Sequence, residues 1–360
     1  MKQAWVSTAF HGTVGQKKPD AGGHRGAIHL RARVCEMGNH RPRMDLADPT
    51  FDDVLAARRR LQGRVHCTPV FHSDTFDRLC GAQVHFKCEN LQRAGAFKAR
   101  GAMNAVQSLS DADSALGVIT HSSGNHGAAL ALAARERGIP ADVVVPKGTA
   151  RVKVDAILRY GARLHECEPT LAARELLAQE IVSRTGGTLV HPFDDPRVIA
   201  GQATAALELM TTVPELGVLV APVSGGGLLA GSALAGHGVK RDLRVWGAEP
   251  LQADDAARSL TAGRLIQTGN GSTIADGLRA MLSPRTFRLL VAHQVEVVTV
   301  SEAEIVEAMR LTWDILKLVV EPSGAVAVAA LLQKKDARWV GQRVGVVLSG
   351  GNVDLSALPW

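Results

Sequence analysis

The feature that most constrains the fold is an alternation, from residue 116 onward, between short β-branched runs and longer segments of helical pattern. The runs GVITHS, ADVVVP and GVLVAPV are each followed by apolar residues at helical spacing. Because neighbouring parallel strands need a long crossover connection, this order predicts parallel-rich sheets covered by helices. The C-terminal part repeats the theme, with helices expected over residues 302–317 and 323–335 before the strand VGVVLS. We expect an α/β enzyme with a cleft between two lobes.

The domain boundaries follow from the same pattern. Asp52 to Leu61 is expected to form a surface helix, and residues 82–88 alternate like a strand. We expect a large domain built from residues 46–109 and 193–360, and a small domain from residues 110–192.

The first 45 residues show neither helical nor strand periodicity. Two interpretations stay open for this segment. It is either a transit peptide, because it is rich in Arg and poor in acidic residues, or a disordered extension from an overlong start, with Met44 as the functional initiator. The missing Ser-rich amphipathic pattern favours the second.

Charge and cysteine content exclude several classes of protein. The chain carries a net charge of +6, but residues 1–45 hold 8 Lys/Arg and 3 Asp/Glu, which leaves only +1 on the rest. With a single Tyr for base stacking, no nucleic-acid partner is expected. Five cysteines without CxxC pairs favour a reducing cytoplasm. The uncharged run from residue 217 to 236 contains Pro222 and three consecutive glycines, so it predicts strand, loop and helix start, not a membrane span.

Two polar segments lie at expected helix starts. In residues 89–106, a loop leads through Phe97 and Lys98 into a helix, although a lysine at such a place is usually only a solvated charge. The second segment joins GVITHS to the next helix with small, amide and imidazole side chains from Ser122 to His126. Backbone N–H groups at a helix N-terminus favour a carboxylate there. An ordinary N-cap needs only one or two such residues.

Two further segments are rich in glycine. The loop Ser224, Gly225, Gly226, Gly227 and Leu228 follows a strand and opens a helix. Glycines let successive N–H groups curl around a phosphate, and the loop has neither the Walker ending nor GxGxxG spacing. The last segment, VLSGGNVD, places Ser349 at a strand end, where a plain turn is the alternative.

In this order, the four segments resemble the fold-type II family of pyridoxal-phosphate enzymes, within it the serine racemase and serine/threonine dehydratase branch. The resemblance runs from about residue 50 to the C-terminus and includes the stretches VIAGQATAALEL, TIADGLR and VEPSGAVAVAALL. It implies the two-lobed architecture of the tryptophan synthase β family, pyridoxal 5′-phosphate as cofactor, an amino-acid substrate and a homodimer. The cofactor is implied by the resemblance and not by composition or spacing.

The resemblance assigns a role to each matching position. Lys98 matches the Schiff-base lysine and Phe97 the aromatic residue near the cofactor ring. Asn125 matches the residue that bonds the ring oxygen, and Ser349 the partner of the pyridine nitrogen. The phosphate cup matches Ser224, Gly225, Gly226, Gly227 and Leu228, and the Ser224 hydroxyl offers one more donor where many relatives have Gly.

The substrate and cation positions follow in the same way. The loop that takes the substrate carboxylate matches Ser122, Ser123, Asn125 and His126. Arg174 matches an arginine that binds the substrate or its second carboxylate. In AEPLQADDA, Glu249, the carbonyl of Ala253 and Asp255 match a divalent-cation site, and such oxygen ligands suit Mg²⁺ or Ca²⁺. The alternative is a solvated acidic strand end.

The expected reaction is elimination from a β-hydroxy amino acid to a 2-keto acid and ammonia. A serine/threonine dehydratase is the first expectation, and 3-hydroxyaspartate ammonia-lyase is a variant of it if Arg174 receives a second carboxylate. Serine racemase is the other alternative, because Ser123 is expected to return a proton on the face opposite Lys98. A non-catalytic protein that only stores the cofactor would release no keto acid.

Overall fold

The structure is a computed structural model that describes residues 46–360, apart from residues 268, 270 and 334–337. The expectations for residues 1–45, including a start at Met44, lie outside the described residues. The described residues belong to one compact unit. Their four cysteines are free thiols. None of their helices is long and apolar enough to cross a membrane.

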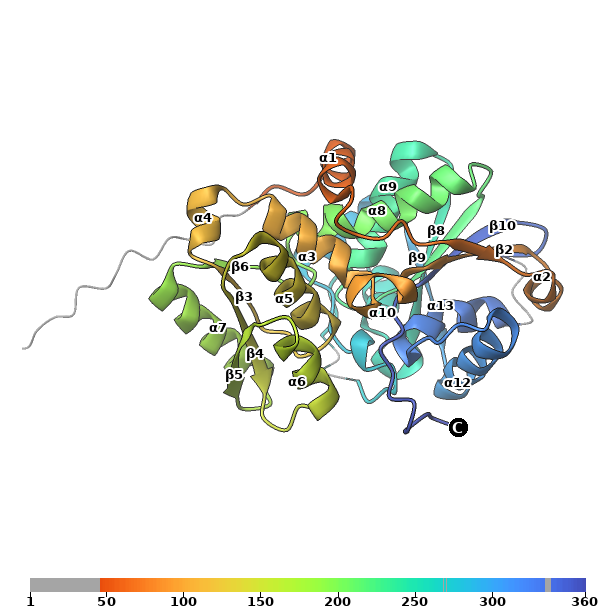
Figure 1. Ribbon diagram of the computed structural model, residues 1–360. Coiled ribbons are helices and arrows are strands. Elements are labelled where there is room, and N and C mark those ends of the chain that lie inside the picture. Colours follow the sequence, from red (N-terminus) through yellow and green to blue (C-terminus); the bar gives the residue numbers. More distant parts are fainter. Residues whose placement is uncertain (1–45, 268, 270, 334–337) are drawn as a thin grey trace, which may run out of the picture. The chain divides into compact units, whose positions relative to one another are not determined.

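Two sheets organise the described chain (Figure 1). The larger has the strand order β1-β2-β10-β7-β8-β9, in which only the β1–β2 pair is antiparallel. Its strands are β1 (Val70–His72), β2 (Gln83–Cys88), β7 (Val218–Pro222), β8 (Arg244–Pro250), β9 (Glu296–Val300) and β10 (Arg343–Leu348). The smaller sheet has the order β5-β4-β3-β6, all parallel. Its strands are β3 (Val118–Thr120), β4 (Ala141–Pro146), β5 (Arg163–Cys167) and β6 (Thr188–Leu189).

Helices connect most of these strands. The α-helices are α1 (Phe51–Leu61), α2 (Asp74–Cys80), α3 (Lys98–Gln107), α4 (Asp111–Ala115), α5 (Asn125–Arg137), α6 (Arg151–Leu158), α7 (Leu171–Thr185), α8 (Pro196–Thr212), α9 (Gly227–Val239), α10 (Asp255–Ala262), α11 (Pro284–Ala292), α12 (Glu302–Leu311) and α13 (Pro322–Leu332). Short 3₁₀ turns are η1 (Glu89–Leu91), η2 (Arg93–Gly95), η3 (Leu251–Ala253) and η4 (Asp276–Leu278), and η5 (Thr312–Leu316) is a π-helical turn.

The larger sheet is buried on both faces. Successive strand side chains point to opposite faces, so Val218 and Val220 of β7 pack in one apolar cluster, with α13, and Leu219 packs in another, with α8 and α9. The side chains of β10 are distributed between the same two clusters. A parallel strand covered on both sides needs apolar residues at every position, which explains the near-continuous run GVLVAPV.

The smaller sheet is layered in the same manner. Val118 and Val143 pack with α3 and α5, whereas Ile119 and Val144 pack with α7 on the other face. Figure 1 shows this sheet between α7 and α5.

The expected α/β class is confirmed by these parallel-rich sheets. The helix expected over residues 302–317 is present but changes type: α12 stops at Leu311, and the π-helical turn η5 continues to Leu316. Lys317 ends it in the left-handed conformation (φ 58°). The helix expected over residues 323–335 ends at Leu332. The strands of the smaller sheet all come from residues 110–192, and the division into a large and a small domain stays a prediction.

Candidate functional site

Lys98 is the first residue of α3, after the turn η2 and the N-cap residue Phe97. Its amine donates a hydrogen bond to the carbonyl oxygen of Pro192, at 2.9 Å, and lies 5.0 Å from the centre of the Phe97 ring. Among the described residues it has no carboxylate partner, and burial lowers its pKa to about 8. At pH 7 about one tenth of such amines are neutral, far more than for an ordinary lysine, and the neutral form is the nucleophilic and basic one.

The segment Pro192–Phe193 joins Lys98 to the glycine loop. Pro192 accepts the Lys98 hydrogen bond, and the Phe193 side chain packs on Gly225. A Cβ at Gly225 would lie 2.4 Å from the Phe193 ring, and one at Gly227 would lie 3.0 Å from the Phe193 Cβ. Only glycine permits this close approach, and the loop and the lysine amine thus contact the same dipeptide.

The glycine loop forms the N-terminal end of α9. Gly226 caps the helix with φ 86°, a conformation that side chains disfavour. Its missing Cβ would also lie 2.7 Å from Thr286. The first N–H groups of a helix have no partner within it, so the loop is suited to an anion such as a phosphate. The Ser224 hydroxyl donates to the carbonyl of Ala280 and accepts from its N–H, both at 3.1 Å. That proton fixes the loop and is not a free extra donor.

Ser349 follows β10 and lies beside the lysine segment. Its carbonyl accepts from the Phe97 N–H at 3.0 Å, and Gly350 forms an antiparallel bridge with Ala96. The Ser349 hydroxyl is buried and donates to the carbonyl of Ser323 at 3.4 Å. The resemblance places this hydroxyl at the pyridine nitrogen, and a hydroxyl, unlike a carboxylate, does not favour a protonated nitrogen.

Asn125 begins α5 and contacts two residues whose roles the sequence did not indicate. Its amide donates to a Glu321 carboxyl oxygen at 2.8 Å, and its own oxygen accepts from Asn352 at 2.9 Å. Burial raises the pKa of Glu321 to about 8, and the charge of Asp276 adds to this. The second Asn125 amide hydrogen has no acceptor among the described residues.

The loop between β3 and α5 exposes two serine hydroxyls. Ser122 and Ser123 are half-buried, and neither hydroxyl has a hydrogen-bond partner among the described residues. His126 is buried, and its Nε2 lies 3.3 Å from the Val190 carbonyl, which can only accept. Nδ1 is therefore an acceptor and has no partner. Burial and then the charge of Lys98 lower the pKa of His126 to about 3. A neutral acceptor does not bind a carboxylate, so the structure does not support the carboxylate-binding role expected of His126. For the other loop residues that role stays a prediction.

Arg174 lies in the first turns of α7, after β5. Burial raises the pKa of the Cys167 thiol and the nearby charge of Arg174 opposes that rise, which places the guanidinium near the end of β5. It forms no ion pair among the described residues. Because β3, β4 and β5 are parallel, their carboxyl ends share one edge, where ligands bind in open α/β sheets. Arg174 and the loop from Ser122 therefore lie at the same edge.

Glu249 and Asp255 bring two buried carboxyl groups together. Glu249, the last residue but one of β8, has 0% exposure and accepts from the N–H groups of Ala256 and Ala257. Burial raises its pKa to about 9. Asp255 begins α10, and burial raises its pKa to about 6. Neither has a basic partner in the described chain, and the buried Ala253 lies between them in sequence. A divalent cation would offset the cost of two buried like charges.

The segment Ala280–Leu282 touches both the glycine loop and this acidic pair. Ala280 exchanges two hydrogen bonds with Ser224, and the N–H of Leu282 donates to Asp255 at 2.9 Å. The Leu282 side chain also packs against Gly226, because a Cβ added at Gly226 would lie only 2.8 Å from it.

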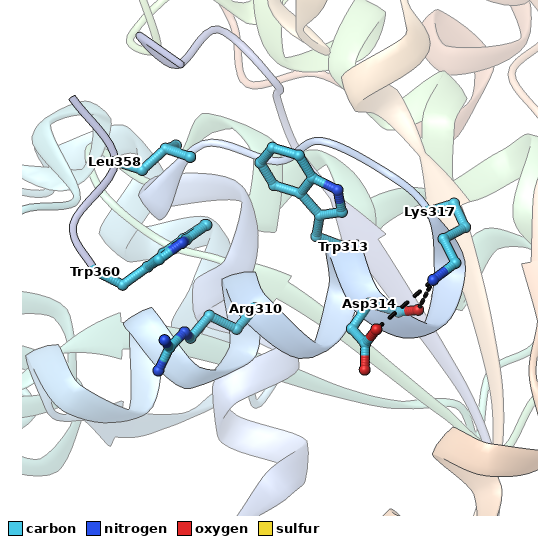
Figure 2. A pocket seen from close by; sticks show the side chains of 6 residues that line it. All are labelled: Arg310, Trp313, Asp314, Lys317, Leu358 and Trp360. Atoms are coloured by element: carbon cyan, nitrogen blue, oxygen red, sulfur yellow. Dashed lines mark hydrogen bonds and ion pairs between the residues drawn. The ribbon is translucent and has the colours of Figure 1, made fainter. Parts of the chain in front are cut away.

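A separate surface pocket of about 330 Å³ lies on η5 and the last residues of the chain (Figure 2). The indole rings of Trp313 and Trp360 flank it, with ring centres 6.0 Å apart. None of the predicted site residues lines it, so we assign it no part in the chemistry.

Comparison with known families identifies the class of protein. Residues 61–350 match the family described as "Pyridoxal-phosphate dependent enzyme". The match covers most of the chain, so the protein belongs to this family, and its cofactor is pyridoxal phosphate. The lysine amine, the glycine loop at a helix N-terminus and the Ser349 hydroxyl fit that cofactor.

Individual relatives are lyases and racemases. The chain is 48% identical over 312 residues to the β-hydroxyaspartate dehydratase of Paracoccus denitrificans (strain Pd 1222), covering 87% of this chain and 99% of that protein. It is 48% identical over 313 residues to the serine racemase of Arabidopsis thaliana, covering 85% of this chain and 95% of that one. The solved structure of maize serine racemase matches with a TM-score of 0.84 at 41% identity, covering 86% of this chain and 95% of that one.

Proposed function

We propose that this enzyme eliminates water from 3-hydroxyaspartate, giving oxaloacetate and ammonia overall. The observation that carries the proposal is Arg174, a guanidinium without an acidic partner at the sheet edge that also holds the carboxylate-binding loop. A substrate with a second carboxylate supplies the partner that serine and threonine lack, and an arginine fork suits it. The dehydratase relative supports this choice over the serine/threonine dehydratase first expected from the sequence.

The residues divide the work in a simple way. Bound pyridoxal phosphate withdraws electrons from the substrate Cα and so makes its proton acidic. The loop from Ser122 to Asn125 binds the α-carboxylate, and Arg174 binds the β-carboxylate. With the cofactor and substrate bound, the Lys98 amine would remove the Cα proton. Its pKa of about 8 suits a base working near neutral pH.

The experiment compares the activity on several substrates of the wild type and of two arginine variants. Keto acid and ammonia are measured with the 3-hydroxyaspartate diastereomers, L-serine and L-threonine. We expect one diastereomer to give a kcat/KM at least ~10-fold above that of L-serine, and Arg174→Gln to lower it by ~100-fold, the scale of a lost charged hydrogen-bond pair. L-serine turnover should change by less than about 3-fold.

The matched control is Arg184→Gln, an exposed arginine in the last turn of the same helix. It should leave both substrates unaffected. Serine as the best substrate, or an equal loss for both substrates in Arg174→Gln, would show that Arg174 does not select a dicarboxylate.

Racemisation of serine is a second candidate, favoured by the Ser123 hydroxyl. The Ser123 hydroxyl has no hydrogen-bond partner among the described residues and is free to carry a proton. The serine racemase relatives support this candidate.

We further propose that Glu249, the Ala253 carbonyl and Asp255 hold Mg²⁺ or Ca²⁺. The support is the pair of buried carboxyl groups with raised pKa values and no basic partner among the described residues. All three ligands are oxygen atoms, which these hard cations prefer.

A further inference from the structure

The stretch VIAGQATAALEL, to which the proposed function gives no role, lies on α8 and packs against α3. The two helices meet at two glycines. A Cβ at Gly201 would lie 2.6 Å from the Cα of Gly101, and one at Gly101 would lie 2.8 Å from the carbonyl oxygen of Val198. Only glycine permits such an approach. The helix α8 therefore packs directly on the backbone of the first turns of α3, which begins with Lys98.

The start of α3 is capped by α8 and not by its own N-cap residue. Phe97 offers no side-chain hydrogen bond there. Instead, the side-chain oxygen of Gln202 accepts from the Gly101 N–H at 3.0 Å, across 101 residues of sequence. Gln202 is fully buried, and its amide nitrogen has no hydrogen-bond partner among the described residues. A buried amide with only one end bonded costs stability, so the contribution of Gln202 is its bond to α3.

Arg100 anchors the other side of the same turn. Residues two apart on a helix point about 200° away from one another, so the Arg100 side chain leaves α3 on the side away from the Lys98 amine. Its guanidinium is fully buried and donates two bonds to Glu89 and two to Glu208 of α8, each pair at 2.7 and 2.8 Å. Lys87 also donates to Glu208, at 2.6 Å. Two basic and two acidic groups thus balance one another.

The orientation of this buried group matters more than its stability. Apolar residues in place of buried ion pairs often cost no stability. They do not reproduce the directions of the bonds, because a planar guanidinium held by two carboxylates neither rotates nor slides freely.

We propose that Arg100 and Gln202 are positioning residues for Lys98. Together they fix the rotation and the axial position of the first turn of α3, and so hold the lysine amine at 2.9 Å from the Pro192 carbonyl. The inference rests on the proposed role of Lys98 and not on which substrate the enzyme prefers. A displacement of about 1 Å at a reacting group can cost ~100-fold in rate.

The test replaces each positioning residue by a similar side chain that loses its bonds. Arg100→Lys keeps the charge and loses the fork, and Gln202→Met keeps the length and loses the acceptor. Each should lower kcat by ~10- to 100-fold and change KM by less than about 3-fold, because the groups proposed to bind the substrate lie beside α5 and on α7. Should Arg100→Lys not fold, Gln202→Met decides alone.

A second measurement does not depend on turnover. Apoenzyme is mixed with pyridoxal phosphate, and covalent attachment of the cofactor is followed by visible circular dichroism. The rate of attachment should fall at least ~10-fold in both variants, because the amine no longer meets the cofactor in one fixed position.

Two controls separate positioning from general stability. Arg163→Lys removes the same two-bond fork to a carboxylate, that of Asp142, between two strands of the smaller sheet. Ile305→Ala opens a cavity in the apolar cluster around α13, which contains no residue of α3. Both variants should keep the kcat and the attachment rate of the wild type.

Wild-type kcat and attachment rate in both Arg100→Lys and Gln202→Met would overturn the proposal. A loss in Ile305→Ala as large as theirs would also overturn it, because lowered stability would then explain the effect. Lys98→Ala distinguishes this failure from that of the proposed function. Full activity in Lys98→Ala would refute the role of Lys98 itself, whereas an inactive Lys98→Ala beside unaffected Arg100 and Gln202 variants would refute the positioning alone.

Discussion

Replacing Glu321 by Gln should stabilise the protein at neutral pH, by an amount that grows as the pH rises. Glu321 is 7% exposed, and burial raises its pKa from 4.5 to about 8. Between these values the folded protein keeps a proton that the unfolded chain releases. Raising the pH therefore favours unfolding of the wild type. Gln is neutral throughout and keeps an oxygen to accept the Asn125 hydrogen bond.

The size of the effect follows from the pH interval between the two pKa values of Glu321, in the unfolded and in the folded chain. Each pH unit between the two pKa values changes the free energy of unfolding by about 1.4 kcal/mol. The stability gained by Glu321→Gln should grow from under about 1 kcal/mol at pH 5 to about 3 kcal/mol at pH 7. Above pH 8 it should level off near about 5 kcal/mol.

Urea unfolding at pH 5, 6, 7 and 8, at constant pyridoxal phosphate, measures this difference. Glu307→Gln, an exposed glutamate of α12, is the control and should give no such trend. A gain from Glu321→Gln that is constant with pH, or that shrinks as the pH rises, would refute the reasoning.

Three further outcomes are expected. Lys98→Ala should abolish keto-acid formation, because it removes the amine proposed to hold the cofactor and to act as the base, and full activity in this variant would contradict the assignment. Chelation should lower the Tm and Mg²⁺ or Ca²⁺ restore it, whereas Asp255→Ala should not respond; equal Tm values with and without chelator would exclude a bound cation. Ser123→Ala should keep pyruvate formation from L-serine, while any D-serine formation falls at least ~100-fold, the scale of a lost general acid. Equal loss of both products would instead show a binding role for Ser123.

The layers of the fold could be predicted because strand and helix periodicities are local. The run GVLVAPV and the glycines after it indicated both β7 and the start of α9. The extent of the helix expected over residues 302–317 was nearly right, because α12 and the π-helical turn η5 together reach Leu316. The change to a π turn after Leu311 was not predicted, since no local sequence signal marks it. The left-handed residue that ends the turn is Lys317, which is neither Gly nor Asn.

The site could be predicted only in part, for a related reason. No local pattern distinguishes Lys98 from a surface lysine, and the resemblance to a family was needed to single it out. The hydrogen bond from Lys98 to Pro192 spans 94 residues, and that from Asn125 to Glu321 spans 196. In the sequence, Glu321 was only part of the stretch VEPSGAVAVAALL. Its hydrogen bond with Asn125 and its raised pKa depend on burial, which no local pattern indicates.

The segment Ala280–Leu282 connects the glycine loop to the acidic pair through hydrogen bonds. It is bonded to Ser224 at one end and to Asp255 at the other. If an ion at Asp255 tightens the hold on the cofactor phosphate by some factor, the cofactor must tighten the hold on the ion by the same factor. The affinity measured for the cation would then depend on how much of the enzyme carries cofactor, and apoenzyme would lose its ion first.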